Sequence, residues 1–156
     1  MLALQALCLY DALGAYFDTH IDVFLRDTVN QHELGLRRSL DPEAVSFARA
    51  LATGAWRAHG RYDELLGSTA RAWSVQRMPP IDRNILRLGL HELLEHPATP
   101  AQVVINEAIE LARHFGDAES PAFVNGVLDT IRRDCGIAIA DERPAPAGGG
   151  APPPQE

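Results

Sequence analysis

The chain lacks lysine altogether: all fourteen of its basic residues are arginine, set against 21 acidic residues and a formal net charge of −7. Non-specific affinity for nucleic acid comes from several phosphate contacts made by clustered basic side chains. Here the arginines are scattered among acids. The composition therefore argues against a general polyanion binder, and any binding of RNA or DNA would have to be local or shared with a basic partner.

Cysteine and long apolar runs are also scarce. Cys8 and Cys135 lie far apart, each within an apolar helical pattern, so we expect buried free thiols in a reducing compartment. No run approaches the roughly 18 apolar residues that a membrane-spanning helix needs. The segment from Met1 to Leu13 lacks the positively charged start of a signal peptide. We therefore expect a soluble, cytoplasmic protein.

Signatures of catalysis and metal binding are missing as well. The six histidines show no HExxH motif or paired metal spacing, and His91 and His96 do not share a helix face. There is no P-loop, no GxGxxG and no GxSxG motif. Most acidic residues fit solvated helix faces or first turns, so no acid/base pair stands out. The sequence predicts no enzyme, no metal site and no cofactor.

Apolar residues recur at helical spacing along most of the chain, and no segment shows the alternation typical of a strand. The pattern predicts an all-α fold of about seven helices. Their expected ranges are 1–13, 21 to about 35, 41–59, 62–73, 81–95, 104–115 and 120–131.

Local signals support several of these boundaries. Asp41 is expected to cap a helix that has Pro42 in its first turn, and Ser120 is expected to cap the last helix in the same way, ahead of Pro121. Small side chains at Ala52 and Gly54 predict close contact with another helix.

The stretch from 103 to 128 carries polar and glycine residues at unusual helical positions. Asn106 and Gly126 each cost helix stability relative to alanine. We interpret them mainly as packing devices, Gly126 for close helix approach and Asn106 to cap or bridge a buried backbone group. The functional alternative is a ligand surface at the loop edge, residues 113–123, because loops held by rigid helices often carry binding sites.

The end of the chain differs in composition from the rest. Residues 138–156 are rich in proline, glycine and alanine without an apolar period, which predicts a disordered tail. The expected organisation is one folded domain over residues 1–137, followed by this tail at 138–156.

Three ordered blocks resemble the NusB family of bacterial transcription antitermination factors. They are IDRNILRLGLHELL at 81–94, VVINEAIELARHFG at 103–116, and Ser120 followed by FVNGVLD at 123–129. Weaker matches are LALQAL at 2–7 and residues 47–54, so that the resemblance covers nearly all of the expected folded part.

The resemblance implies two packed three-helix bundles without enzymatic activity. It also implies binding of single-stranded boxA RNA from ribosomal-RNA leaders, jointly with the ribosomal protein NusE, within the RNA polymerase antitermination complex. The acidity of the chain suits a basic ribosomal partner, since charge complementarity raises association rates. A related domain occurs fused to ribosomal-RNA cytosine methyltransferases, for which this chain has no room.

The resemblance also assigns candidate residues to two surfaces. For RNA it implies Arg113 as a phosphate contact, Glu119 and Ser120 in the loop, and Phe123 as a stacking ring, with Tyr10 as a weaker stacking candidate. For NusE it implies four residues on what we expect to be the exposed side of the fifth helix: Asp82, Arg83, Arg87 and His91. Several of these residues also have a structural interpretation. It is core packing for Phe123, a solvated cation at a helix end for Arg113, and an ordinary charged helix face for the four residues of the fifth helix.

Two departures from the family keep an alternative open. The arginine-rich segment that precedes the first helix in the family is not found here, and Cys8 stands where an aromatic residue is common. Fewer phosphate contacts would weaken single-strand binding and reduce its salt dependence. The alternative is a NusB-fold protein-interaction module that has lost RNA binding.

Overall fold

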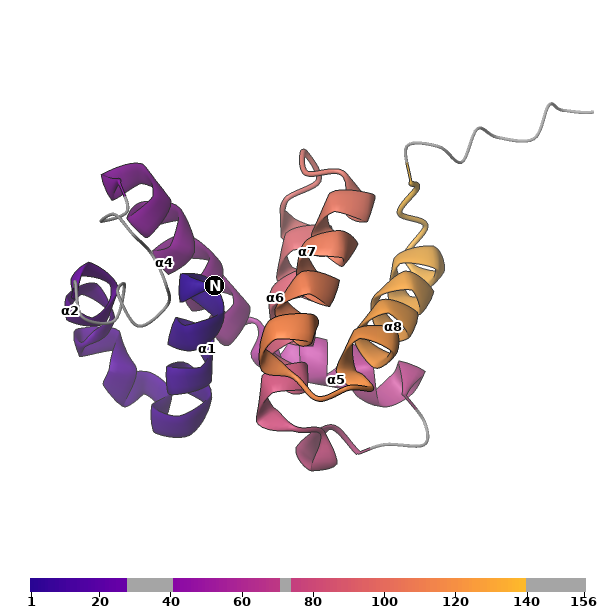
Figure 1. The fold of residues 1–156 in the computed structure, drawn as a ribbon, viewed down its shortest axis with the longest axis horizontal. Coiled ribbons are helices and arrows are strands. Elements are labelled where there is room, and N and C mark those ends of the chain that lie inside the picture. The colour runs from indigo at the N-terminus through magenta and orange to yellow at the C-terminus, as the bar shows by residue number, and fades with distance from the viewer. Residues whose placement is uncertain (28–40, 71–73, 140–156) are drawn as a thin grey trace, which may run out of the picture.

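The computed structural model describes residues 1–27, 41–70 and 74–139, and within these ranges the chain is helical and contains no strand (Figure 1). Seven α-helices and two short 3-10 helices are found there: α1 (Leu2–Leu13), η1 (Gly14–Thr19), α2 (Ile21–Arg26), α4 (Pro42–Arg57), α5 (His59–Thr69), η2 (Val75–Arg77), α6 (Pro80–Glu95), α7 (Ala101–Phe115) and α8 (Ser120–Asp134). The predicted all-α class is confirmed.

The helices form two groups that stand side by side in Figure 1. One group consists of α1, η1, α2 and α4, and the other of α5 to α8. Helix α6 joins them, because it packs against α1 and α4 on one side and against α7 and α8 on the other. This arrangement matches the expected pair of packed bundles.

Because α6 has neighbours on both sides, most of its surface is buried. Its apolar residues Ile85, Leu86 and Leu90 are fully inaccessible to solvent. Helix α6 approaches α8 closely at Gly89, where an added Cβ would lie 3.0 Å from Leu128 Cδ1. Polar residues of α6 are buried as well, among them Asp82, Arg87 and His91.

The predicted start of α4 is confirmed. Asp41 is its N-cap and accepts a hydrogen bond from the Ala44 N–H at 2.7 Å, with Pro42 in the first turn. The predicted close contact at Ala52 and Gly54 is also confirmed. Ala52 is fully buried, and a Cβ at Gly54 would lie 2.4 Å from His91 Nε2 of α6.

Three local predictions are wrong. The fourth helix was expected to begin at Tyr62, but α5 begins at His59, so that Gly60 lies inside it. Gly126 does not mediate close packing, because a Cβ there would meet nothing within 4 Å. Asn106 is exposed, and its side chain accepts a hydrogen bond from the Gln102 side chain at 2.8 Å, so that its partner among the described residues is another exposed side chain and not a buried backbone group. Asn106 and Gly126 both lie on solvent-exposed faces of their helices, and the apolar pattern alone did not show that these positions are outside the core.

Some expectations lie outside the described residues. These fall on residues 28–40, on 71–73 and on the tail from residue 140 onward. Within the described residues, α2 ends at Arg26 and α5 at Thr69, earlier than the expected ends near residues 35 and 73. Within the described ranges, no helix is both long and apolar enough to cross a membrane.

Candidate RNA and partner interface

Polar side chains on α6 hold the two helix groups together. The Arg87 side chain is 5% exposed, and its guanidinium pairs with Asp11 of α1 at 2.8 Å and with Asp63 of α5 at 2.7 Å. Arg83 pairs with the same Asp11 at 2.6 Å, and Asn84 donates to it at 3.1 Å. Burial alone would raise the pKa of Asp11, but the hydrogen bonds from Arg83 and Arg87 outweigh it and lower the pKa.

His91 is enclosed where α4, α5 and α6 meet. Its Nδ1 is hydrogen-bonded to the Tyr62 hydroxyl at 2.9 Å, and its ring fills the space left by Gly54. Burial and the neighbouring His96 lower the pKa of His91, while Glu95 acts in the opposite direction. Burial and Glu95 raise the pKa of Tyr62 to about 12, so that its hydroxyl stays protonated.

The expected exposure of the four α6 residues is therefore wrong. Asp82, Arg87 and His91 are 4%, 4% and 8% exposed, and Arg83 is half-buried against Asp11. The reason is that α6 packs against both helix groups. Its polar side chains therefore contact other helices, whereas those of an outer helix would face water. Of the four, Asp82 lines a surface pocket.

The loop between α7 and α8 is closed by a compact set of hydrogen bonds. Asp117 Oδ1 accepts from the backbone N–H groups of Glu119 and Ser120, both at 3.0 Å, and from the Ser120 hydroxyl at 3.1 Å. Ser120 Oγ in turn accepts from the Asp117 N–H at 3.0 Å. Hydrogen bonding from the Glu119 N–H and the Ser120 hydroxyl lowers the pKa of Asp117.

This geometry corrects the predicted cap of the last helix. Glu119 is the N-cap residue of α8 and Ser120 is its first helical residue, and the capping oxygen comes from Asp117. Ser120 is 1% exposed because it packs against Gly116, where an added Cβ would lie 2.5 Å from Ser120 Cβ. Steric room, and not an unusual φ, requires glycine at this position.

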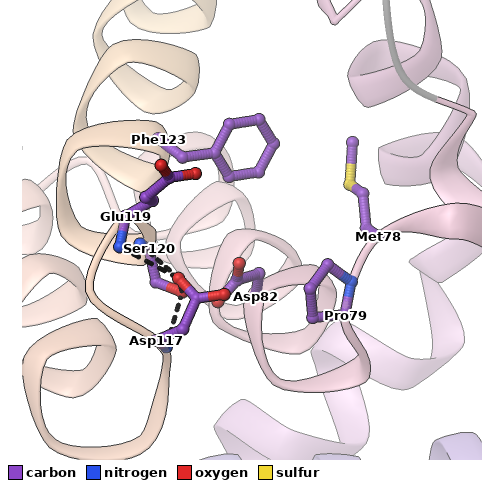
Figure 2. A pocket seen from close by; sticks show the side chains of 7 residues that line it. All are labelled: Met78, Pro79, Asp82, Asp117, Glu119, Ser120 and Phe123. Carbon is purple, nitrogen blue, oxygen red and sulfur yellow. Dashed lines mark hydrogen bonds between the residues drawn. The ribbon is translucent and has the colours of Figure 1, made fainter.

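A pocket of about 280 Å³ lies between this loop and the start of α6 (Figure 2). Figure 2 shows the Phe123 ring and the Met78 side chain across from each other, with Asp82 below Phe123 and Pro79 below Met78. The full lining is Met78, Pro79, Asp82, Asp117, Glu119, Ser120 and Phe123. The pocket thus brings one predicted partner-binding residue together with three predicted RNA-binding residues.

Asp82 is the most unusual side chain of the pocket. Its Oδ1 atom is buried and has no hydrogen-bond partner among the described residues. Burial raises the pKa of Asp82, the Ser120 hydroxyl lowers it, and the nearby Asp117 carboxylate raises it further. Position in the first turn of α6 favours its ionised form.

The remaining predicted RNA-binding residues do not form one surface. Arg113 is exposed near the end of α7 and pairs with Glu110. Tyr10 is fully buried, donates to Asp18 at 2.8 Å and stacks on Trp56, so its expected role as a stacking platform is wrong. An aromatic on the apolar face of α1 packs into the core, since α4 and α6 cover that face.

An exposed aromatic residue ends the apolar stripe of α7. Phe115, the last residue of α7, is 40% exposed and lies beside the His114 ring, close in sequence to Arg113. Because Phe115 is the last residue of the apolar stripe and directly precedes Gly116, its exposure could have been recognised from the sequence. Nothing in the sequence indicated that Met78 and Pro79 line the pocket, since their pattern shows only a helix boundary.

No group of three or more His, Cys, Asp or Glu residues in the described ranges could hold a metal ion. The pocket instead offers carboxylates and apolar walls beside an exposed loop, on a helical frame held together by α6. These features suit a helical protein that acts as a binding adaptor.

Comparison with known proteins identifies the adaptor class. The NusB family model matches residues 1–133, and the chain belongs to this family. A transcription antitermination protein NusB from Symbiobacterium thermophilum is 40% identical over 143 residues, which are 90% of this chain and 92% of that protein. The predicted family is confirmed, and with it the expectation of an antitermination factor without enzymatic activity.

Solved structures support the same fold. NusB of T. maritima has 32% sequence identity and a TM-score of 0.65, over 85% of this chain and 87% of that chain. A structure of the antitermination factors NusB and NusE in complex with double-stranded RNA has 24% identity and a TM-score of 0.68, over 85% of this chain and 92% of that chain. The latter likeness concerns the fold alone.

Proposed function

We propose that this chain is a cytoplasmic RNA-binding adaptor that recognises boxA RNA together with ribosomal protein NusE and supports antitermination during ribosomal-RNA transcription. Family membership over residues 1–133 supports this proposal. It is also supported by the assembly of a related NusB with NusE and RNA. The RNA-binding unit would be the helical domain over residues 1–137.

The observation that carries the proposal is the geometry of the α7–α8 loop. Hydrogen bonds between Asp117 and Ser120 hold the loop on two long helices, which makes it a rigid platform. Phe123 lies at its edge, half-buried and lining the pocket, where a ring can stack on an unpaired base. Glu119 lines the pocket beside it, and Arg113 is exposed at the end of α7.

For the protein partner, we propose that the surface centres on the start of α6. Asp82 would contact the partner directly, because it lines the pocket. Arg83, Arg87 and His91 would contribute indirectly, by fixing α6 against α1, α4 and α5. The net charge of −7 suits a basic ribosomal protein.

The second candidate is a protein-interaction module that does not bind RNA. It is favoured by the three carboxylates around Phe123 and by the burial of Tyr10, both of which weaken an RNA surface. The two candidates differ in one observable, which is the effect of RNA sequence on binding.

Titration of fluorescently labelled boxA RNA and of a scrambled RNA, with and without NusE, tests the proposal. We expect weak binding of boxA by the chain alone, tighter binding with NusE, and a preference for boxA over the scrambled RNA. Equal binding of both RNAs with NusE present would overturn the proposal. Binding of NusE without any RNA-dependent gain would instead support the interaction module.

A further inference from the structure

The corner between α4 and α5 carries basic and aromatic side chains that the proposed function does not use. Here the chain passes from one helix group to the other (Figure 1). Between Glu43 and Asp63 the sequence contains three arginines and no acidic residue, although the whole chain is acidic. None of the residues of this segment lines the pocket beside the α7–α8 loop. The corner is therefore a surface of its own, built from a segment whose charge is opposite to that of the chain.

Three aromatic rings stack at this corner. Trp56 lies nearly parallel to Tyr10, with ring centroids 5.6 Å apart and an interplanar angle of 14°. His59 lies nearly parallel to Trp56, with centroids 4.1 Å apart and an angle of 7°. The stack begins at the fully buried Tyr10 and reaches the surface at Trp56 and His59, which are both half-buried. Partly exposed rings of this kind form a platform on which an unpaired base can stack.

The backbone fixes the orientation of the His59 ring. Its Nδ1 is hydrogen-bonded to the Trp56 carbonyl oxygen, at the turn that joins the two helices. Nδ1 therefore carries a proton, because a carbonyl oxygen can only accept. Nε2 has no hydrogen-bond partner among the described residues, so it is available to a ligand.

Two arginines flank this stack in the sequence. Arg57, in the last turn of α4, is exposed and has no hydrogen bond or ion pair with another described residue. Arg61 pairs with Glu95, but this pair is exposed and contributes little to stability, so that a phosphate can compete for the guanidinium. The nearby Asp63 is engaged by Arg87. The corner therefore offers guanidinium groups that an anion can reach.

The combination of rings and guanidinium groups favours nucleic acid over an acidic protein. A carboxylate of a partner protein would pair with the arginines and leave the rings unused. A single-stranded nucleotide uses both features, since its phosphate pairs with basic side chains and its base stacks on aromatic rings.

Building on the proposed function, we propose that the α4–α5 corner binds single-stranded RNA outside boxA, with a base continuing the stack at His59 and its phosphate paired with Arg57 and Arg61. The chain then holds its RNA at two places, boxA at the α7–α8 loop and a flanking nucleotide at this corner. Two linked contacts on one RNA raise the overall affinity, because the second contact forms at a high effective concentration.

The salt dependence of binding tests the contribution of charge. The full chain, Arg57→Gln and Arg26→Gln are titrated with two RNAs at several salt concentrations, with NusE present. One RNA is boxA alone, and the other is boxA flanked on both sides by unstructured uridine tracts. Arg26→Gln is the matched control, because Arg26 is likewise an exposed arginine in the last turn of a helix but lies on α2, outside the corner.

We expect the unmodified chain and Arg26→Gln to bind the flanked RNA severalfold more tightly than boxA alone. Arg57→Gln should lose most of this gain, and its slope of log affinity against log salt should become shallower by about 0.7, the value for one phosphate contact with a single strand. An undiminished gain in Arg57→Gln, or an equal loss in Arg26→Gln, overturns the inference.

The same titrations separate this inference from the proposed function. If the flanks add no affinity while boxA is still preferred over a scrambled RNA, the inference fails and the proposed function stands. Equal binding of boxA and the scrambled RNA overturns the proposed function.

Unfolding midpoints separate binding from folding. Arg57 has no partner among the described residues, so Arg57→Gln should unfold at the same temperature as the unmodified chain. Loss of the gain together with a lower midpoint would assign Arg57 a structural role and overturn the inference.

Tryptophan fluorescence reports on the stack itself. The chain has two tryptophans, so Trp73→Phe leaves Trp56 as the only indole. In this protein we expect the flanked RNA to quench the fluorescence and boxA alone to leave it unchanged, and His59→Gln to reduce the quenching. Absence of quenching by the flanked RNA overturns the inference. Arg57-dependent binding of poly-glutamate that is tighter than binding of the flanked RNA would assign the corner to an acidic protein and also overturn it.

Discussion

At the scale of single residues, His91 illustrates how a titratable group is built into the junction of the helices. Its imidazole is hydrogen-bonded to Tyr62 and lies against Gly54, with His96 and Glu95 as its charged or chargeable neighbours. The folded state holds the pKa of His91 below its ordinary value, chiefly through burial. Folding therefore favours the neutral ring.

This setting predicts a pH dependence of stability. As pH falls through about 6.5, the unfolded chain takes up a proton that folded His91 does not, so the free energy of unfolding decreases. One such proton gives a slope of at most about 1.4 kcal/mol per pH unit. His91→Asn, which retains a group able to pair with Tyr62, should flatten the slope in urea unfolding between pH 7.5 and 5.5.

The exposed His114 provides the control for this prediction. His114→Asn should leave the pH dependence of unfolding close to that of the unmodified chain. An unchanged slope in His91→Asn would show that the buried imidazole does not govern the acid sensitivity of the fold.

Residue exposure was also the hardest property to predict from the sequence. The stripe of Arg83, Arg87 and His91 was expected to face solvent, because charged residues on one side of a helix usually do. The structure turns it inward, since Asp11 and Asp63 from distant segments supply partners for the arginines. Spacing along one helix carries no information about such distant partners.

At the scale of elements, the α7–α8 loop depends on a steric requirement at one glycine. A Cβ at Gly116 would lie 2.5 Å from Ser120 Cβ and 2.8 Å from the Ala112 carbonyl oxygen, and that oxygen cannot move without disturbing α7. Glycine at position 116 therefore allows Ser120, at the start of α8, to pack directly against the end of α7.

Gly116→Ala should therefore destabilise the protein by about 1–3 kcal/mol, as overpacking typically does. Gly126→Ala provides the comparison, since its Cβ would meet nothing within 4 Å. That variant should stabilise helix α8 by roughly 0.5–1 kcal/mol. Chemical denaturation of both proteins measures the difference, and equal effects of the two changes would contradict the packing argument.

Helix positions were predictable to a large extent. The 3.6-residue period located α1, α4, α6, α7 and α8, and Asp41 with Pro42 defined the start of α4 as observed. Prediction was weaker where local signals competed. Serine is a residue type that commonly caps helices, so Ser120 was expected to cap α8. The capping oxygen instead comes from Asp117, whose side chain reaches the backbone N–H groups at the start of α8. A sequence pattern does not determine which of two nearby oxygens reaches the backbone.

At the scale of the whole molecule, the two helix groups are joined through α6 and its arginines. Arg87 contacts Asp11 in one group and Asp63 in the other, and its side chain is 5% exposed. Removing one member of a buried ion pair leaves the other charges unpaired, which usually costs about 3–5 kcal/mol. The orientation of the two helix groups relative to each other rests on this junction.

Arg87→Ala should accordingly lower the free energy of unfolding by about 3 kcal/mol or more. Arg61→Ala is the matched control, because Arg61 pairs with Glu95 in an exposed position, where such pairs contribute less than about 1 kcal/mol. Urea unfolding at neutral pH compares the two variants. A cost for Arg87→Ala no larger than that of Arg61→Ala would show that the arginine junction contributes little.

The central claim is that the edge of the α7–α8 loop, residues 113–123, is the RNA-binding surface of this NusB-family chain. Photo-cross-linking of boxA RNA that carries 4-thiouridine, with NusE present and with adducts mapped by mass spectrometry, tests it most directly. We expect adducts at Phe123 and its loop neighbours, and their loss in Phe123→Leu. Adducts confined to other helices, with none in residues 113–123, would contradict the account.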